Sequence, residues 1–293
     1  MRHLLLVLVI LCVPARQADD VTLDADGVPI RFTVQGEEGD ALVLLHGFAA
    51  NLEMFRMAGL VDLFAKDYRV ISIDARGHGK SGKPHAPDAY GIEMVEDVVR
   101  ILDFMEIEAA HVLGYSMGGM ITAKLVMTHP DRVLSAVVGA YGWPEPVPPG
   151  EGLMDRLAAS LEAGTGFGPL LRALTPEGAP PMSDAELAMA DRMLLGNNDA
   201  LALAAVARGF HELAVQEDEL RANEVPTLAI VGADDPLAAD VVRMEGVMAN
   251  LDVVMIEGAD HTTAGMSSVF RESAVGFLGG RLQPAASGAG RDD

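Results

Sequence analysis

Short apolar runs recur along the chain, and stretches with helical spacing lie between several of them. The runs are four to six residues long and contain few polar residues, as expected of strands that are buried on both faces of a sheet. They occupy positions 41–45, 70–73, 110–113, 133–138, 227–231 and 253–256. Two further short strands, 21–23 and 30–34, flank an Asp26-Gly27 pair that is typical of a hairpin turn.

Helices are predicted between these strands. Apolar residues recur at helical spacing from Ile92 to Met105, and 117–128 is a second helix that Pro130 stops. A third helix is predicted over 52–66, with Asn51 as a possible N-cap. Because strands and helices alternate through most of the chain, the pattern predicts an α/β fold with a mainly parallel sheet.

Two segments interrupt the alternation. Positions 144–150 contain four prolines, and 151–222 is rich in Ala, Leu and Met, with breaks at Gly164, Gly166, Gly168 and Pro180-Pro181. We therefore expect a helical cap over 144–222 on a core formed by 19–143 and 223–282. The small, polar tail 283–293 is expected to be disordered.

The N-terminal apolar run 4–13 follows Arg2 and His3. A membrane helix needs about twenty residues, so this shorter run predicts no stable membrane span and fits a signal peptide over 1–18. Export to the periplasm or the medium is expected; the alternative is a tail that stays uncleaved on a cytoplasmic protein. Acylation of Cys12 is a weaker reading, because Leu11 replaces the small residue expected before it.

The composition and net charge of the chain argue against several kinds of partner and site. The chain has 293 residues, 50% hydrophobic and 22% charged, which suits one continuous core. Its net charge of −22 would repel phosphate backbones, so nucleic acid is not an expected partner. Cys12 is the only cysteine, so the chain can form neither an internal disulfide nor a cysteine metal cage. The oligomeric state stays open.

A candidate nucleophile lies where the predicted strand 110–113 meets the helix 117–128. The sequence Gly114-Tyr115-Ser116-Met117-Gly118 matches G-x-S-x-G, and a sharp strand-to-helix turn would project the Ser116 hydroxyl at the carboxyl edge of the sheet. A free serine is a poor nucleophile near neutral pH and needs a base.

His261 is the candidate base, because it follows the predicted strand 253–256 and so reaches the same edge. The carboxylate that would orient it follows the strand 227–231, where Asp235 is favoured over Asp234 and Glu145 is a distant third. The chain order Ser, Asp, His is the one typical of the strand-turn-helix nucleophile.

Two backbone N–H groups are candidates for an oxyanion hole. Met117 directly follows the nucleophile, and Phe48 follows the buried strand 41–45 within His46-Gly47-Phe48. His46 is interpreted as a brace for this loop or as a satisfied core histidine. The segment 74–81 is interpreted as a structural loop without chemistry.

Together these motifs resemble the α/β-hydrolase superfamily. They are His46-Gly47-Phe48, Asp74-Ala75-Arg76-Gly77-His78-Gly79-Lys80-Ser81, Gly114-Tyr115-Ser116-Met117-Gly118-Gly119, Gly232-Ala233-Asp234-Asp235-Pro236 and Gly258-Ala259-Asp260-His261. The resemblance covers about 21–280 and implies an eight-stranded, mostly parallel sheet, a helical cap between the sixth and seventh strands, and no metal or cofactor. Ser116 argues against the haloalkane dehalogenase and epoxide hydrolase branches, which have aspartate there.

The form Gly-Tyr-Ser-Met-Gly-Gly is similar to esterases, enol-lactone hydrolases and cofactor-free haloperoxidases. Many relatives have a small residue at the position of Asp260. The Asp260 carboxylate is expected either to raise the basicity of His261 or to face solvent. The hypothesis is hydrolysis of a small or medium carboxylic ester by Ser116, His261 and Asp235. Alternatives are lactone, thioester or carbon–carbon hydrolysis or perhydrolysis at the same residues, or a fold member that only binds a small ligand.

Overall fold

The computed structural model describes residues 19–148 and 150–280. Its centre is an eight-stranded sheet in the order β1-β2-β4-β3-β5-β6-β7-β8. The pairs β1–β2 and β2–β4 are antiparallel, and every later pair is parallel. The predicted α/β class with a mostly parallel sheet is confirmed. The strands are β1 (Asp19–Ala25), β2 (Val28–Gln35), β3 (Ala41–Leu45), β4 (Arg69–Ile73), β5 (Ala110–Tyr115), β6 (Val133–Gly139), β7 (Thr227–Gly232) and β8 (Leu251–Ile256).

The α-helices fall into two groups, one packed on the sheet and one between β6 and β7. The first group is α1 (Glu53–Met57), α2 (Leu60–Phe64), α3 (Ile92–Phe104), α4 (Met117–Thr128), α10 (Ala238–Glu245) and α11 (Ser268–Gly279). The second is α5 (Leu153–Glu162), α6 (Gly168–Ala173), α7 (Asp184–Leu195), α8 (Ala200–Gly209) and α9 (Glu217–Ala222).

Alternate residues of each central strand enter different cores, because successive side chains of a strand point to opposite faces. On β3, Val43 and Leu45 pack with α3 and α4 on one face. Leu42 and Leu44 pack with α1, α2 and α11 on the other. All four side chains are buried, which explains the unbroken apolar run in the sequence.

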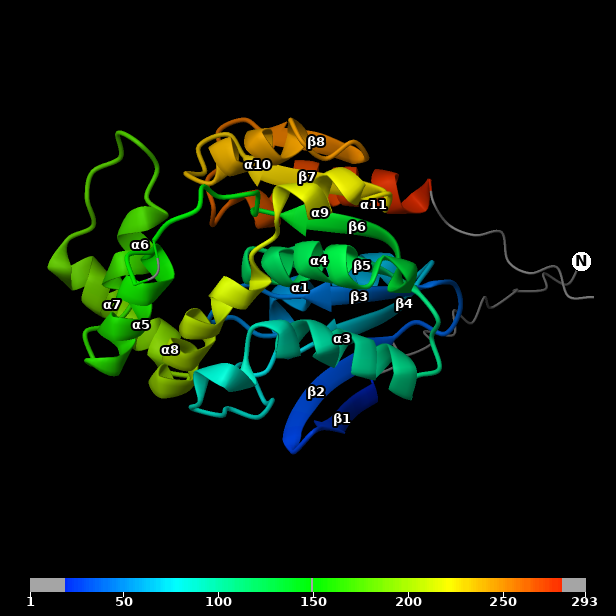
Figure 1. Cartoon of the computed structure of the whole chain (residues 1–293), viewed down its shortest axis with the longest axis horizontal. Helices are drawn as coiled ribbons and strands as arrows, with labels where there is room; N and C mark the ends of the chain where they lie inside the picture. Colours follow the sequence, from blue (N-terminus) through cyan, green and yellow to red (C-terminus); the bar gives the residue numbers. More distant parts are fainter. Residues whose placement is uncertain (1–18, 149, 281–293) are drawn as a thin grey trace, which may run out of the picture.

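Among its described residues, the segment between β6 and β7 contains helices joined by loops, with no strand, and includes the 3₁₀ helix η3 (Phe210–Leu213). Figure 1 shows α5 to α8 grouped together, beyond the end of the sheet to which the arrows of β6 and β7 point. Leu157, Phe167 and Leu203 form the centre of a separate apolar cluster within this group. The helical segment therefore lies at the carboxyl edge of the parallel strands, where the loops of the sheet end.

The helix predicted over 52–66 is wrong in one respect, because the structure has two short helices there. The break follows Ala58, at Gly59, which has a φ of 71° in the left-handed region that glycine adopts without strain. The N-cap residue of α1 is Leu52, although the Asn51 side chain accepts a hydrogen bond from the Glu53 N–H at 3.0 Å. The hairpin at Asp26-Gly27 is confirmed. The predicted signal peptide with Cys12 and the predicted tail 283–293 lie outside the described residues.

Two glycines let the start of α4 approach the sheet at backbone distance. A Cβ on Gly118 would overlap the carbonyl group of Leu45 at the end of β3, and one on Gly114 would overlap the carbonyl group of Gly118. Thr122 Oγ1 donates to the Gly118 carbonyl oxygen at 2.8 Å, which satisfies this acceptor within the helix. The helix therefore begins directly on the ends of β3 and β5.

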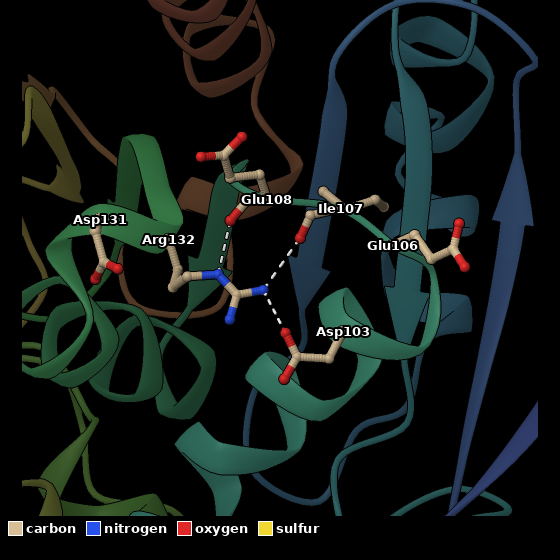
Figure 2. A pocket seen from close by; sticks show the side chains of 6 residues that line it. All are labelled: Asp103, Glu106, Ile107, Glu108, Asp131 and Arg132. Atoms are coloured by element: carbon tan, nitrogen blue, oxygen red, sulfur yellow. Dashed lines mark hydrogen bonds and ion pairs between the residues drawn. The ribbon is translucent and has the colours of Figure 1, made fainter.

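The opposite edge of the sheet is held by Arg132, in the 3₁₀ helix η2 (Pro130–Arg132) before β6. Its guanidinium donates to Asp103 Oδ1 at 2.7 Å and to the carbonyl oxygens of Glu108 at 2.6 Å and Ile107 at 3.0 Å. Figure 2 shows these bonds in a hollow that is also lined by Glu106 and Asp131. Arg132 thereby ties the end of α3 to the starts of β5 and β6.

Over the part of the chain that the structure describes, no helix combines the length and apolarity needed to cross a membrane.

Replacing Gly118 by alanine should destabilise the protein by about 3 kcal/mol or more, because the new methyl group meets a backbone carbonyl that cannot move aside. Gly276 in α11 is the matched control, since nothing lies within 4 Å of a Cβ built there. Gly276→Ala should raise the free energy of unfolding by about 0.5–1 kcal/mol through helix propensity alone. Urea unfolding of both variants measures these effects; equal effects at the two positions would contradict the proposed backbone contact.

Candidate active site

Ser116 is the single residue between β5 and α4, and its backbone is strained. Its φ of 55° and ψ of −113° lie in a region that residues with a side chain rarely adopt, at a cost of about 1–3 kcal/mol. The Ser116 N–H donates to the Gly139 carbonyl oxygen at 2.7 Å, and the Ser116 carbonyl accepts from the Met120 N–H at 3.0 Å. These bonds hold the sharp turn that exposes the hydroxyl at the carboxyl edge of the sheet.

His261 reaches Ser116 from the loop after β8. Its Nε2 lies 2.9 Å from Ser116 Oγ, and its Nδ1 lies 2.8 Å from Asp235 Oδ2. A carboxylate only accepts hydrogen bonds, so the proton on the ring is assigned to Nδ1, which leaves Nε2 as the acceptor for the Ser116 hydroxyl. His261 is 7% exposed and Asp235 is 4% exposed, so little water competes for these bonds.

Of the three carboxylates considered from the sequence, the structure places Asp235 beside His261. Asp235 Oδ1 accepts from the Leu237 N–H at 2.9 Å, so both carboxylate oxygens are held. Asp234 is exposed, and Glu145 pairs with Arg243 at 3.0 Å on the surface. Asp235 therefore also satisfies a backbone donor at the turn that leads into α10.

Tyr115 was missed by sequence reasoning, because it occupies the variable position before the serine. Its hydroxyl donates to the His261 carbonyl oxygen at 2.8 Å and accepts from the Gly265 N–H at 3.1 Å. Burial raises the pKa of the Tyr115 phenol, so it stays neutral and keeps its proton as a donor. One side chain next to the candidate nucleophile thus holds the loop that carries the candidate base at two points. The His261 carbonyl is 146 positions away in the chain, so no local pattern could have indicated the contact.

The Asp260 carboxylate holds the same loop from the other side. Its Oδ1 accepts from the backbone N–H and the hydroxyl of Thr262, at 3.0 and 2.8 Å, and from those of Thr263, at 2.9 and 2.8 Å. Burial alone would raise the pKa of Asp260, but the bonds from Thr263 and Thr262 outweigh it and lower the pKa to about 2. These side-chain bonds of Asp260 go to the two threonines, and the carboxylate stays partly exposed to solvent.

The candidate oxyanion donors come from two elements that meet at Ser116. A Cβ built on Gly47 would lie 3.5 Å from Ser116 Cβ, so the loop after β3 contacts the candidate nucleophile directly. Met117 is the first residue of α4, where helix N–H groups are unpaired and the helix dipole favours negative charge. Among the described residues, neither the Phe48 N–H nor the Met117 N–H donates to another protein group. Both donors are available to an oxygen bound at Ser116.

His46 braces this loop rather than facing the candidate nucleophile. Its Nε2 accepts from the Ala75 N–H at 3.1 Å, so its proton lies on Nδ1, which donates to the Gly47 carbonyl oxygen at 2.8 Å. Burial lowers the pKa of His46 and lowers that of the neighbouring His78 to about 3. Both rings are therefore neutral near pH 7.

Buried Asp74 joins three segments below the site. Its Oδ1 accepts from the Leu52 N–H at 2.8 Å, and its Oδ2 accepts from the Lys80 N–H at 2.9 Å and from the Arg31 guanidinium at 3.0 Å. The side chain of Asp74 is fully buried, so these bonds replace the water that the carboxylate loses.

Within residues 19–148 and 150–280, no group of three or more His, Cys, Asp and Glu side chains is arranged to hold a metal ion.

Comparison with known proteins relates part of the chain to a family of known fold. A family model for the alpha/beta hydrolase fold matches residues 40–165. Over 127 residues, 42% of this chain, the sequence is 36% identical to the dihydrolipoyllysine-residue acetyltransferase component of an acetoin cleaving system from Cupriavidus necator. Over 120 residues, 40% of this chain, it is 38% identical to a fluoroacetate dehalogenase from a Burkholderia species. The matched stretches span 33% and 38% of those two proteins.

Solved structures match over more of the chain. Est816, an N-acyl homoserine lactone degrading enzyme, superposes with a TM-score of 0.70 and 28% sequence identity, covering 88% of this chain and 100% of Est816. Because it covers 88% of the chain, the match extends well beyond the 40–165 stretch of the family model.

The Asp260→Asn variant should lose stability at pH 7 and lose less in acid. The pKa of Asp260 falls from 3.8 to about 2 on folding, so its stabilisation is complete above about pH 5 and disappears as the pH falls through 2. Because the side chain is partly exposed, we expect a loss of about 1 kcal/mol at pH 7, shrinking to about half by pH 3. Urea unfolding at both pH values measures it, with exposed Asp252→Asn as the control. A loss that does not change with pH would contradict the role of the Asp260 charge.

Proposed function

Because the chain belongs to the α/β-hydrolase superfamily, we propose that it is a serine hydrolase that cleaves a small or medium carboxylic ester through Ser116, His261 and Asp235. The observation that carries the proposal is the unbroken hydrogen-bonded line from Ser116 Oγ through both ring nitrogens of His261 to Asp235 Oδ2, at 2.9 and 2.8 Å. A hydroxyl in such a line can lose its proton to the imidazole as it attacks.

In the first half of the reaction, Ser116 Oγ attacks the ester carbonyl carbon while His261 Nε2 takes the hydroxyl proton. The carbonyl π electrons move onto oxygen, and the N–H groups of Phe48 and Met117 donate to that developing oxyanion. Asp235 stabilises the imidazolium that forms. When the carbon–oxygen bond to the alcohol breaks, His261 gives its proton to the leaving oxygen, and the acyl group stays on Ser116.

The second half uses the same groups with water in place of the alcohol. His261 Nε2 removes a proton from water, the hydroxide oxygen attacks the acyl carbon, and the oxyanion forms again at Phe48 and Met117. Collapse of this intermediate breaks the bond to Ser116 Oγ, which recovers its proton from His261. The products are one carboxylic acid and one alcohol, and the enzyme returns to its starting state.

Ser116 distinguishes this chain from relatives whose nucleophile is a carboxylate. The dehalogenase and epoxide hydrolase branches that this chain resembles have aspartate at the nucleophile position, where this chain has serine. A serine hydroxyl forms an acyl ester with a carbonyl substrate and needs a general base to do so. The 2.9 Å hydrogen bond between Ser116 Oγ and His261 Nε2 supports that chemistry.

The substrate is proposed to be largely uncharged. Phe48 and Met154 are partly buried and pack against both the core of the sheet and the apolar cluster of the helical segment, so apolar groups line the junction of the two. From 151 to 222 there are twelve Asp and Glu and five Arg, a net charge of −7. An acidic cap disfavours anionic substrates and leaves neutral or cationic esters.

Lactone hydrolysis is the second candidate, and the similarity to Est816 favours it. Est816 degrades N-acyl homoserine lactones, and 28% of its aligned residues are identical to this chain. A lactone is a cyclic ester, so the same attack by Ser116 would open the ring, and the alcohol would remain attached to the acyl group. Comparing linear esters with lactones of equal acyl length separates the two candidates.

The Ser116→Ala variant should lose about 10⁵- to 10⁶-fold in kcat on p-nitrophenyl acetate and butyrate, because no other group can form the acyl intermediate. A fluorophosphonate probe should label the parent protein once and leave Ser116→Ala unlabelled. Exposed Ser268→Ala serves as the control and should keep both turnover and labelling. Equal ester turnover by Ser116→Ala and the parent would remove the mechanism.

Asp235→Asn and Asp234→Asn form a matched pair in adjacent positions. Asp235→Asn keeps an oxygen for the Leu237 N–H but presents an amide to His261, which favours the wrong ring tautomer, so kcat should fall about 10⁴-fold. Asp234→Asn changes an exposed side chain and should leave kcat within about twofold. Steady-state kinetics at pH 7 to 8 decides between them, and the reverse ranking would transfer the orienting role to Asp234.

A further inference from the structure

The loop that carries one candidate oxyanion donor is strained. Gly47–Ala50, which we call the oxyanion loop, closes a turn in which the Ala50 N–H donates to the Gly47 carbonyl oxygen at 3.1 Å. Ala49, the third residue of this turn, has a φ of 58°. That position of such a turn normally holds glycine, because a Cβ crowds the backbone there. Something outside the loop must therefore hold it in this conformation.

Asn198 supplies that hold from the helical segment. It lies between α7 and α8, and its Nδ2 donates to the Ala49 carbonyl oxygen at 2.8 Å and to the Leu194 carbonyl oxygen, also at 2.8 Å. Both hydrogens of the amide are used, one toward the oxyanion loop and one toward its own helix. The next residue, Asp199, caps α8 and lies 2.9 Å from His85 Nε2 of the core, so this turn is tied to the core at two points.

The ring of Phe48 is held by the same segment. It makes edge contacts with Phe167 and Phe210, at centroid distances of 6.2 and 5.8 Å, and with His78 of the core at 5.6 Å. Phe167 precedes α6 and Phe210 begins η3. The Phe48 N–H would bind the oxyanion. The Phe48 ring and the Ala49 carbonyl, which follow it along the chain, are both anchored to the helical segment.

We propose that Asn198 is a positioning residue for hydrolysis: by holding the Ala49 carbonyl, it keeps the oxyanion loop in its strained turn and the Phe48 N–H aimed at the oxyanion. The inference rests on the proposed function. If Ala49 relaxes to a negative φ, the neighbouring peptide groups must rotate, and the loop moves relative to Ser116. The helical segment thereby sets the reactivity of the site.

The Asn198→Leu variant has a side chain of similar size without a donor. It should lower kcat about 10- to 100-fold with KM within about threefold, because a displaced oxyanion donor weakens transition-state binding more than substrate binding. Exposed Asn197→Leu is the control and should keep the parent kcat. Thermal unfolding shows whether each variant is folded. A parent-like kcat in folded Asn198→Leu would overturn the inference.

A double-mutant cycle with Ala49→Gly separates positioning from general loss of structure. Glycine adopts a φ of 58° without strain, so the loop no longer depends on Asn198, and the kcat loss caused by Asn198→Leu should shrink at least threefold in the Ala49→Gly background. Purely additive losses would overturn the inference. If Asn198→Leu does not fold, Asn198→Ala carries the same cycle with the same two outcomes.

The two proposals fail in different ways. A parent protein that neither hydrolyses any ester or lactone nor reacts with a fluorophosphonate removes the proposed function, and the inference about Asn198 with it. A parent protein that does both, together with parent-like kinetics in Asn198→Leu, removes the inference alone and leaves the triad in place.

Discussion

The site depends on the close approach of one helix to two strands. Only one residue separates the end of β5 from the start of α4, and this is possible because Gly114 and Gly118 put backbone against backbone at the ends of β5 and β3. Ser116 takes the strain of that turn, with a φ of 55°. The same contact brings the loop after β3 against Ser116, so the candidate nucleophile and both candidate oxyanion donors are set by one packing arrangement. A side chain at Gly118 would push α4 away from the end of β3 and so displace the candidate nucleophile and the candidate oxyanion donors relative to one another.

Around this turn, the loop bearing His261 is held independently from two directions. Tyr115 fixes it from the strand that leads to the serine, and Asp260 fixes it from within the loop. The loop after β3 is held in a similar way, by His46 from the core and by Asn198 from the helical segment. Groups that must meet within hydrogen-bond distance are thus placed by neighbours whose own positions are fixed, which is the arrangement that general base and oxyanion chemistry requires.

Much of this could be predicted from the sequence, and the residues explain where prediction stopped. Buried parallel strands leave unbroken apolar runs such as 41–45, and carboxyl ends of such strands share an edge, so Ser116, Asp235 and His261 could be grouped before any coordinates. The helix over 52–66 was wrong because one glycine inside an apolar period does not reveal whether it adopts a left-handed φ, as Gly59 does. Tyr115 and Asn198 contact carbonyls 146 and 149 positions away, which no local period records.

The central claim is that an oxygen bound at Ser116 is held by Phe48 and Met117 while His261 bridges Ser116 and Asp235. A crystal structure of the protein after reaction with a fluorophosphonate tests it directly, because the phosphonyl group on Ser116 Oγ mimics the tetrahedral intermediate. The account predicts a phosphonyl oxygen about 2.7–3.1 Å from both backbone nitrogens, with His261 Nδ1 still bonded to Asp235. An adduct on another residue, or a phosphonyl oxygen that accepts from neither Phe48 nor Met117, would contradict it.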